Sequence, residues 1–315
     1  NPTGANVEDG VACFRAGGHD GIIAFGGGSA LDTGKAISFM AGQQSPIWDF
    51  IDEDDNWKRA NTNGIAPLVA VPTTAGTGSE VGRASVIVDE KAQRKRIIFH
   101  PNMMPRIVIA DPALTLGLPP AITAATGMDA LTHCLEAFCA RGFQPMADGV
   151  ALEGIRIIHD WLPRAFDDGA DLTARAHMMA AASMGATAFQ KGLGAVHALS
   201  HPVGALYDTH HGLTNAVILP YVLAFNRPAI GERLTHLSRL LDLGEPAFER
   251  VMSWILGLRT HLGIPNNLAE IGVDDLHAEE IARAAAEDPS ALGNPLAVGP
   301  GELESVFQNA HDGQL

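Results

Sequence analysis

The sequence has few basic residues and no long apolar run, and each shortage excludes a class of protein. Lys and Arg total 21 against 36 Asp and Glu, which gives a formal net charge of -15. A surface of that sign cannot neutralise phosphates, so we expect neither a nucleic-acid partner nor an anionic membrane surface. No apolar run could span a bilayer, and no signal peptide is recognisable in the printed sequence.

Cysteine is also scarce, and the three residues, Cys13, Cys134 and Cys139, form no disulfide pattern. We therefore expect a reducing, cytoplasmic location. Cys134 follows His133 directly, but neighbours on a helix point about 100° apart, so we expect Cys134 to serve packing. Internal repeats and low-complexity segments are absent as well.

What is present is the composition of a globular protein with a large core. The chain has 315 residues, 46% of them hydrophobic, and two domains are the natural expectation. β-branched runs give way to Ala/Leu-rich helical patterns at residue 119. We therefore predict an α/β domain over residues 1–115 and an all-helical domain over 116–315, joined by a linker at 111–118.

Hydrophobic periodicity predicts the individual elements. Strands are expected at 21–25, 67–72, 85–89 and 106–110. Helices are expected at 7–17 and 31–40, then at 150–166, 174–189, 194–206, 213–226, 230–243, 247–262, 278–287 and 301–310. Thr126 and Gly127 are expected to separate a short helix from a second helix that begins at Met128.

A glycine turn at residues 26–29 joins the first predicted strand to the helix at 31–40. Backbone N–H groups, a helix N-terminus and missing side chains together favour a phosphate. The turn is not the usual G-x-G-x-x-G fingerprint, and a tight turn without a ligand is the alternative.

A second loop, at residues 73–80, follows the strand at 67–72 and carries four hydroxyl side chains. Ligands bind at the carboxyl ends of strands in open α/β sheets, so this loop could close on a nucleotide opposite the glycine turn. A plain surface loop is the alternative. Among the basic residues at 91–96, one lysine could reach a ribose or phosphate, and the others are expected to be solvated.

A candidate metal site lies in the second half of the chain. Asp129 and His133 are spaced i, i+4, so both side chains share one face of a helix. His197 lies on a later helix with His201 one turn on, and His211 follows in a polar turn. Three imidazoles and one carboxylate suit iron, zinc or another borderline cation better than Mg²⁺ or Ca²⁺. Histidines satisfied by ordinary core or surface partners are the alternative.

Four motifs in the same order resemble the iron-containing (group III) alcohol dehydrogenases, which have a dehydroquinate synthase-like fold. They lie at residues 26–35, 72–80, 126–133 and 197–212, and the resemblance covers essentially the whole chain. It implies a Rossmann-like domain followed by an all-helical domain, with NAD or NADP and a metal in the cleft between them.

The resemblance also implies roles for individual residues. The metal ligands would be Asp129, His133, His197 and His211. The cofactor would be bound by Asn1, Gly27, Gly28, Ser29, Asp32, Thr73, Thr74, Thr77, Ser79 and Lys95. His201 would be a non-ligand histidine near the nicotinamide, and we expect it to relay a proton.

The sequence departs from the family pattern in places. Gly82 stands where many members have Thr, which removes one possible hydrogen bond to the cofactor. The family's first strands, with the acidic residue that favours NAD over NADP, precede the position that matches Asn1. We therefore expect the sheet to show an exposed edge, and the choice between NAD and NADP stays open.

The resulting hypothesis is a metal-dependent dehydrogenase that interconverts a small primary alcohol and its aldehyde, with Fe²⁺ or Zn²⁺ polarising the substrate oxygen. A homodimer is expected. The alternatives are a zinc polyol dehydrogenase of the glycerol type or a lyase such as dehydroquinate synthase on the same fold. Outside the family, a redox-active iron site of the superoxide dismutase kind and a non-catalytic metal-binding remnant also remain open.

Overall fold

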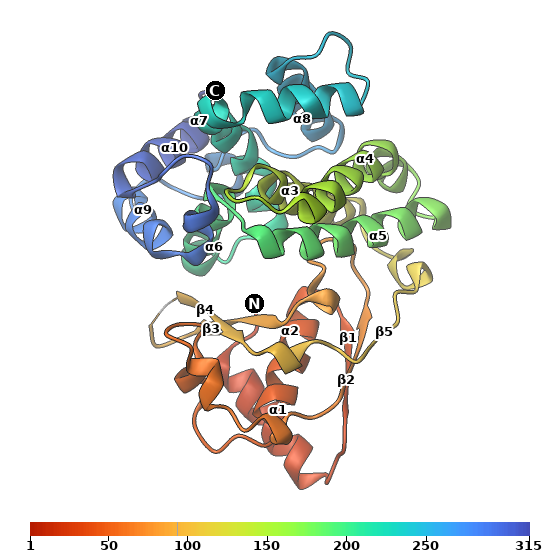
Figure 1. Ribbon diagram of the computed structural model, residues 1–315, viewed down its shortest axis with the longest axis vertical. Helices are drawn as coiled ribbons and strands as arrows, with labels where there is room; N and C mark the ends of the chain where they lie inside the picture. Colours follow the sequence, from red (N-terminus) through yellow and green to blue (C-terminus); the bar gives the residue numbers. More distant parts are fainter. Residues whose placement is uncertain (93) are drawn as a thin grey trace.

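The structure is a computed structural model and describes residues 1–92 and 94–315. Strands and two helices form a lower α/β part, and the remaining long helices stack above it (Figure 1). The expected order, an α/β part followed by an all-helical part, is confirmed. None of the helices in the described ranges is both long and apolar enough to cross a bilayer.

A parallel sheet places the two predicted ligand loops side by side. Its strands run in the order β1 (Ile22–Gly26), β2 (Leu68–Pro72) and β5 (Ile107–Val108). The register of β1 and β2 ends with Gly26 opposite Pro72. The glycine turn and the hydroxyl-rich loop therefore leave the sheet at the same edge, as expected for an open α/β sheet.

An antiparallel hairpin adds a second layer beside the helix α2 (Gly28–Met40). Its strands are β3 (Ala84–Asp89) and β4 (Arg94–Phe99). Of the basic residues at 91–96, Lys91 and Arg94 are exposed as expected, whereas Arg96 is partly buried in β4, which pairs with β3. Helix α1 (Gly4–Ala16) also packs against α2, and apolar residues of α1, α2 and the hairpin share one small core.

Strand β1 lies at an edge of the sheet, as expected. Two of its large apolar side chains are open to solvent, with Ile23 72% and Phe25 60% exposed. The other side of β1 pairs with β2, so only the outer edge and one face of this strand are uncovered.

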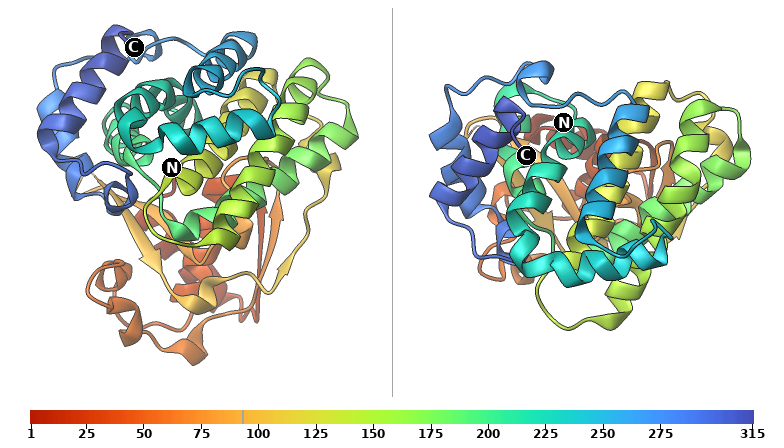
Figure 2. Two further views of the ribbon diagram at one scale, coloured as in Figure 1. Left: turned by 45° about the horizontal axis from the view of Figure 1, so that its top comes forward. Right: turned by 90° about the horizontal axis from the view of Figure 1, so that it is seen from above.

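The helical part is built around α3 (Pro120–Cys139), in which every residue from Thr123 to Cys139 is buried. Helices enclose it, and in the view from above they cover the strands (Figure 2). The other helices are α4 (Pro145–Asp167), α5 (Leu172–Ala188), α6 (Ala195–Tyr207), α7 (His211–Leu240), α8 (Phe248–His261), α9 (Ala278–Glu287) and α10 (Pro300–Asp312).

The expected break at Gly127 was wrong, because α3 is continuous through it. A Cβ at Gly127 would lie 2.2 Å from Cδ1 of Leu162. The glycine therefore lets α4 pack closely on α3 and does not end a helix. A glycine inside a helix costs about 1 kcal/mol relative to alanine. This cost is small beside the free energy gained by burying the apolar side chains that the close packing brings together.

The expected separation of helices at 213–226 and 230–243 was also wrong, since α7 runs unbroken across Pro228. An interior proline costs about 3 kcal/mol because it removes a hydrogen bond and crowds the preceding turn. The apolar stripe continues past it at Ile230, Leu234 and Leu237, all of them fully buried. Packing of this stripe outweighs the local preference to stop.

Candidate metal and cofactor site

Helix α3 carries the first pair of predicted ligands, Asp129 and His133, one turn apart and both buried. His133 Nε2 lies 3.9 Å from Asp129 Oδ1. Gly185 of α5 permits this close packing, because a Cβ there would lie 3.1 Å from Cβ of His133. Both side chains therefore face inward from a buried, closely packed helix.

Helix α6 carries His197, and Glu136 of α3 holds its ring. His197 Nδ1 lies 2.6 Å from Glu136 Oε2, while Glu136 Oε1 accepts a hydrogen bond of 2.8 Å from the backbone N–H of Val196. Burial would lower the pKa of His197, but the hydrogen bond and charge of Glu136 outweigh it and raise that pKa. A carboxylate in this position orients a metal-binding imidazole and makes it more basic.

Helix α7 begins at His211, which the sequence placed in the turn before it. His211 Nε2 lies 3.8 Å from Asp129 Oδ1. The next residue, Gly212, sets this distance, since a Cβ there would lie 2.4 Å from the carbonyl oxygen of Ala125. Any side chain at 212 would push the start of α7 away from α3.

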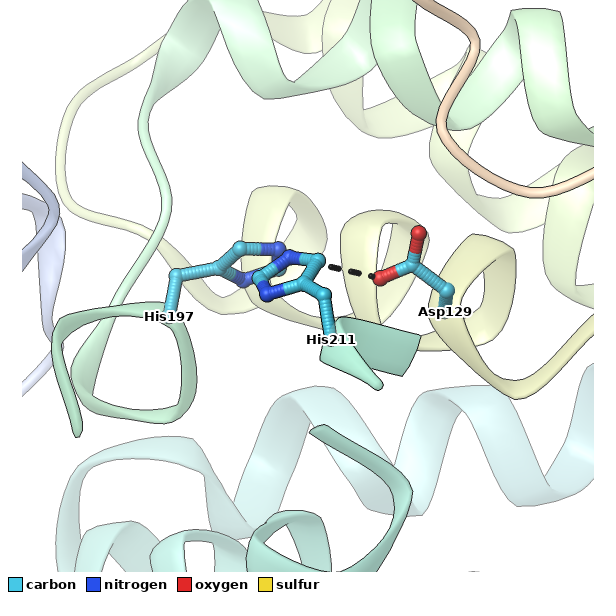
Figure 3. Close-up of side chains that lie close together, drawn as sticks. All are labelled: Asp129, His197 and His211. Carbon is cyan, nitrogen blue, oxygen red and sulfur yellow. Dashed lines mark ion pairs between the residues drawn. The ribbon is translucent and has the colours of Figure 1, made fainter. Parts of the chain in front are cut away.

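Three helices thus bring Asp129, His197 and His211 together, with one potential ligand atom from each within 4.8 Å of the others. Figure 3 shows the two rings and the carboxylate turned toward one another. His133 lies beside this triad, and its ring stacks on that of His197 at a centroid distance of 4.7 Å.

The donor set fits a borderline divalent cation. Burial lowers the pKa of His133 to about 4 and that of His211 well below its usual value. Both rings are therefore neutral near pH 7, and a neutral imidazole offers the lone pair that a metal needs. Nitrogen donors with a single carboxylate suit iron or zinc, whereas Mg²⁺ and Ca²⁺ prefer oxygen.

His201 lies one turn after His197 on α6, and its ring stacks on that of His211 at 5.5 Å. Its Nδ1 lies 2.7 Å from Oδ2 of Asp288. Burial would raise the pKa of Asp288, but His201 and hydrogen bonds from Ser290 lower it overall. A carboxylate therefore fixes the orientation of His201 beside the cluster.

A cavity of about 290 Å³ joins this cluster to the α/β part. On the helical side it is lined by Asp129, His133, Phe189, Gln190, Leu193, His197, His201, His211 and Ser290. On the α/β side, the lining includes these predicted cofactor residues: Asn1, Gly28, Ser29, Asp32, Thr77, Ser79 and Lys95. Gly27, Thr73 and Thr74 lie outside its lining; a Cβ at Gly27 would lie 3.2 Å from the side chain of Thr74.

Asp32 ties the glycine turn to the hydroxyl-rich loop. Its Oδ1 accepts a hydrogen bond of 2.6 Å from Ser79 Oγ, and its Oδ2 accepts one of 2.9 Å from the backbone of Val86. The ammonium of Lys35 lies 3.1 Å from the same carboxylate. Asp32 thus holds the cavity wall in place with both of its oxygens.

Lys95 reaches from β4 to the helical part. A Cβ at Gly204 of α6 would lie 3.1 Å from its Nζ, so the end of the lysine side chain lies against this glycine. Burial lowers the pKa of Lys95, and several aspartates, Asp208 first among them, oppose that shift. Asn1 bridges the same gap through a hydrogen bond of 3.2 Å to Asp208.

Sequence reasoning missed three side chains that contact the predicted site residues. Glu136 and Asn215 follow a predicted ligand by three and four residues on the same helix, so helical spacing could have found them. Asp288 is 87 residues from its partner His201, and no sequence pattern links the two.

Comparison with known proteins agrees with this geometry. Residues 1–112 match the family model for iron-containing alcohol dehydrogenase, and residues 123–311 match that for the C-terminal part of the Fe-containing alcohol dehydrogenase family. The chain belongs to the iron-containing alcohol dehydrogenase family. It is an oxidoreductase that uses a metal and a nicotinamide cofactor on alcohols.

Individual relatives of this dehydrogenase share most of its length. A 4-hydroxybutyrate dehydrogenase of Cupriavidus necator is 40% identical over 98% of this chain and 82% of its own. An NAD-dependent methanol dehydrogenase of Bacillus methanolicus is 36% identical over 98% and 82%. The crystal structure of a 1,3-propanediol oxidoreductase superposes with a TM-score of 0.93 at 36% identity, over 98% and 82%.

Proposed function

We propose that this dehydrogenase catalyses the reversible, NAD(P)-linked oxidation of a small primary alcohol to its aldehyde. The proposal rests on a single cavity. One part of its lining is the cluster of Asp129, His197 and His211, and another is the glycine turn at Gly28 and Ser29. Hydride transfer requires that the cofactor and the alcohol meet. In this cavity, side chains that suit a metal ion lie on one side and a glycine turn that suits a phosphate lies on the other.

In this proposal Asp129, His133, His197 and His211 hold Fe²⁺, or alternatively Zn²⁺. When bound, the ion supplies Lewis-acid polarisation of the substrate oxygen. Glu136 holds the ring of His197, and the buried packing of α3 keeps Asp129 and His133 in place. These side chains thus need little reorganisation to bind a cation.

The cofactor in this proposal lies along the α/β wall of the cavity. Gly28 and Ser29, with Gly27 behind them, would bind the pyrophosphate at the N-terminus of α2. Lys95 and Asn1 would contact the nicotinamide end, because both reach the helical part beside the cluster. The remaining proposed cofactor residues are Asp32, Thr73, Thr74, Thr77 and Ser79.

His201 is the proposed proton carrier. Its Nδ1 is engaged by Asp288, so Nε2 is the ring nitrogen left to exchange a proton. The residue lines the cavity next to His211, and its side chain is 14% exposed. Imidazole is the side chain best suited to pass protons at neutral pH.

Metal removal and a panel of alcohols test the proposed function. The protein is stripped with a chelator under anaerobic conditions, reloaded with Fe²⁺ or Zn²⁺, and assayed with NAD and NADP. We expect activity to disappear and to return with the ion, and His211→Ala to lose metal and activity together. Full activity in metal-free protein would refute the proposal.

The alcohol panel addresses the substrate. Two relatives are named for 4-hydroxybutyrate and for methanol, and the similar crystal structure is of a 1,3-propanediol oxidoreductase. We propose that this enzyme also takes a short primary alcohol or its aldehyde, with 1,3-propanediol, butanol and 4-hydroxybutyrate as first probes of oxidation and lactaldehyde as the first probe of reduction. A clear preference for glycerol would favour a zinc polyol dehydrogenase, and turnover without NAD(P)H formation would favour a lyase.

We further propose a cytoplasmic homodimer whose two domains divide at residue 115. The dimer is proposed because two-fold oligomers are the commonest kind. The boundary is proposed because one family model ends at residue 112 and the other begins at residue 123. Analytical ultracentrifugation tests the dimer: a monomer mass at micromolar concentration would refute it.

A further inference from the structure

One positively charged side chain in the lining of the cavity has no role in the reaction proposed above. The lining includes three cations, Lys35, Arg83 and Lys95. Lys35 lies 3.1 Å from the carboxylate of Asp32, and Lys95 is a proposed cofactor contact. Among the described residues, Arg83 forms an ion pair with none. In a chain with 36 acidic and 21 basic residues, an arginine without a carboxylate partner is available to an anionic ligand.

Two neutral side chains hold the guanidinium of Arg83 in place. Its Nη2 donates a hydrogen bond of 2.9 Å to Oε1 of Gln190, and its central carbon lies 5.5 Å from the centre of the Phe99 ring. A guanidinium has five N–H donors, and this is the one hydrogen bond that they make to a described residue. The group is therefore oriented by its neighbours while most of its donors remain free for a ligand.

Gln190 places this arginine on the side of the cavity that adjoins the predicted metal ligands. Phe189 and Gln190 are neighbours in the short helix η7 (Phe189–Lys191), and both line the cavity. The ring of Phe189 lies 5.1 Å from that of His133, measured between centroids. A substrate with one end at the metal cluster could therefore extend past Phe189 and reach Arg83 with its other end.

The side chains next to Arg83 in the lining are apolar. Ala84 and Phe99 lie opposite each other in the register of the hairpin, and Phe189 lines the helical side. Such a surface suits the methylene groups of a substrate and offers them no hydrogen-bonding partner. The polar contacts for a substrate in this region are thus Arg83 and Gln190.

We propose that Arg83, oriented by Gln190, is a carboxylate subsite, and that the substrate is an ω-hydroxy acid whose hydroxyl end meets the metal cluster. A carboxylate accepts two parallel N–H bonds from a guanidinium, which a second hydroxyl group cannot do. The inference rests on the proposed dehydrogenase function and names a substrate class for it. Arg83 is also open to solvent, so a carboxylate can reach it without a rearrangement of the cavity.

A phosphate of the cofactor is the other anion that Arg83 could meet, and the position of Arg83 argues against it. The glycine turn that suits the pyrophosphate packs on the hydroxyl-rich loop, since a Cβ at Gly28 would lie 2.6 Å from Cγ2 of Thr77. Arg83 instead crosses to Gln190 in the helical part. The substrate is therefore the anion that we assign to it.

The test compares 4-hydroxybutyrate with 1,4-butanediol as substrates of the metal-loaded enzyme, by the ratio of their kcat/KM values. The two compounds differ only in that a carboxylate of the first replaces a hydroxymethyl group of the second. We expect wild type to prefer the acid. Arg83→Met removes the charge and should lower the ratio by about 10-fold, near the lower limit for hydrogen bonds between charged groups because Arg83 is exposed.

Arg106→Met is the matched control. Arg106 is an exposed arginine of the same α/β part and lies outside the lining of the cavity. This variant changes the net charge of the enzyme by the same amount, so it reports any general effect of charge on an anionic substrate. Its ratio should equal that of wild type.

Gln190→Glu tests the subsite while Arg83 stays in place. A carboxylate at position 190 would pair with Arg83 and repel the carboxylate of the substrate, so the ratio should fall as it does in Arg83→Met. If Arg83 only served to hold the two parts of the molecule together, the new ion pair would strengthen that contact and leave the ratio unchanged. Arg83→Lys keeps the charge and should retain part of the preference.

The outcomes separate this inference from the function beneath it. If wild type oxidises both compounds with NAD(P) and Arg83→Met shows the same ratio, or if wild type prefers the diol, the carboxylate subsite is refuted and the proposed function stands. If Arg83→Met raises KM for the cofactor with both substrates alike, Arg83 contacts the cofactor and the subsite is again refuted. If the metal-loaded enzyme oxidises no alcohol, the proposed function fails and the subsite falls with it.

Discussion

At the scale of single residues, burial controls the chemistry of the site. His197 and Asp129 are each 2% exposed, so water cannot satisfy them and each depends on a protein partner. Glu136 contacts His197, and Asn215 contacts both His197 and Asp129. The cluster therefore depends on residues that would not themselves bind the metal.

His201 offers the sharpest prediction at this scale. His201→Asn keeps a hydrogen-bonding side chain but removes the group that can pass a proton. We expect metal content to stay at the wild-type level while the pH–rate profile of alcohol oxidation changes shape. Metal analysis and kcat measured from pH 6 to pH 10 test this. A profile that superposes on that of wild type would remove the role assigned to His201.

The cysteines give a prediction about reactivity. Burial raises the pKa of Cys134 and of Cys139 to about 12, so both remain protonated at pH 8. Cys13 is exposed. A thiol reagent at pH 8 should therefore label Cys13 alone in the native enzyme and all three cysteines after unfolding. Rapid native labelling of a Cys13→Ser variant would contradict the packing role of the other two.

At the scale of elements, glycines decide how closely helices approach. Gly212 brings α7 onto α3 at the metal cluster, and Gly185 brings α5 onto α3 beside His133. Gly194, the residue before α6, lies beside Glu136, and a Cβ there would lie 2.9 Å from Oε1 of that residue. The cluster therefore depends on backbone contacts between helices as well as on its own side chains.

Gly212→Ala tests this dependence. Its Cβ would meet the Ala125 carbonyl at 2.4 Å, and because this atom is backbone, α7 must move. We expect loss of bound metal and a destabilisation of about 1–3 kcal/mol, as for other overpacked sites. Metal content and urea unfolding are the measurements.

Gly231→Ala is the matched control on the same helix. Nothing lies within 4 Å of a Cβ at Gly231, so alanine should stabilise α7 by up to about 1 kcal/mol and leave the metal in place. Equal metal content and equal stability of the two variants would show that the contact at Gly212 does not hold α7 in position for metal binding.

The sequence predicted the motifs better than the elements that carry them. Asp129 and His133 were placed correctly on one helix face because i, i+4 spacing is a local property. Gly127 and Pro228 were misread as helix ends because the packing that overrides them comes from distant residues such as Leu162. The pairing of β4 with β3 was missed because the first three residues of β4 are basic and do not follow the apolar pattern expected of a strand.

The same limit applies to the candidate site. The two loops at 26–29 and 73–80 could be expected to meet, since parallel strands end at the same edge. That Thr73 and Thr74 lie outside the cavity lining, whereas Thr77 and Ser79 line it, depends on the path of the loop in space. The contact between His201 and Asp288 likewise exists only in the folded chain.

At the scale of the whole molecule, a few polar contacts tie the α/β part to the helical part around the cavity. Arg83 donates a hydrogen bond of 2.9 Å to Gln190, and the hydroxyl of Ser183 donates one of 2.7 Å to the buried Glu80. Both contacts lie close to the cavity, so the relative position of the two parts and the shape of the site are linked.

Acid stability is a prediction at this scale, because it concerns unfolding of the whole chain. Burial lowers the pKa of His133 to about 4, against about 6.5 in an unfolded chain. Between these values the unfolded chain binds a proton that the folded chain does not. The stabilisation linked to the neutral ring of His133 is therefore fully present above pH 6.5. About 3 kcal/mol of the free energy of unfolding is lost as the pH falls to 4.

Urea unfolding of the chelator-treated protein from pH 7 to pH 4 measures this loss. His133→Gln removes the titrating group, so its stability should depend less steeply on pH than that of wild type. His211 acts in the same direction and will leave part of the slope in place. Identical slopes in the two proteins would rule out the contribution assigned to His133.

The central claim is that Asp129, His133, His197 and His211 hold one catalytic metal ion. Anomalous X-ray scattering from anaerobically grown crystals of the active enzyme, at the iron and zinc edges, tests it most directly. We predict a single peak enclosed by these four side chains, and the edge at which it appears identifies the metal. Crystals of active enzyme with no anomalous peak among these residues would contradict the claim.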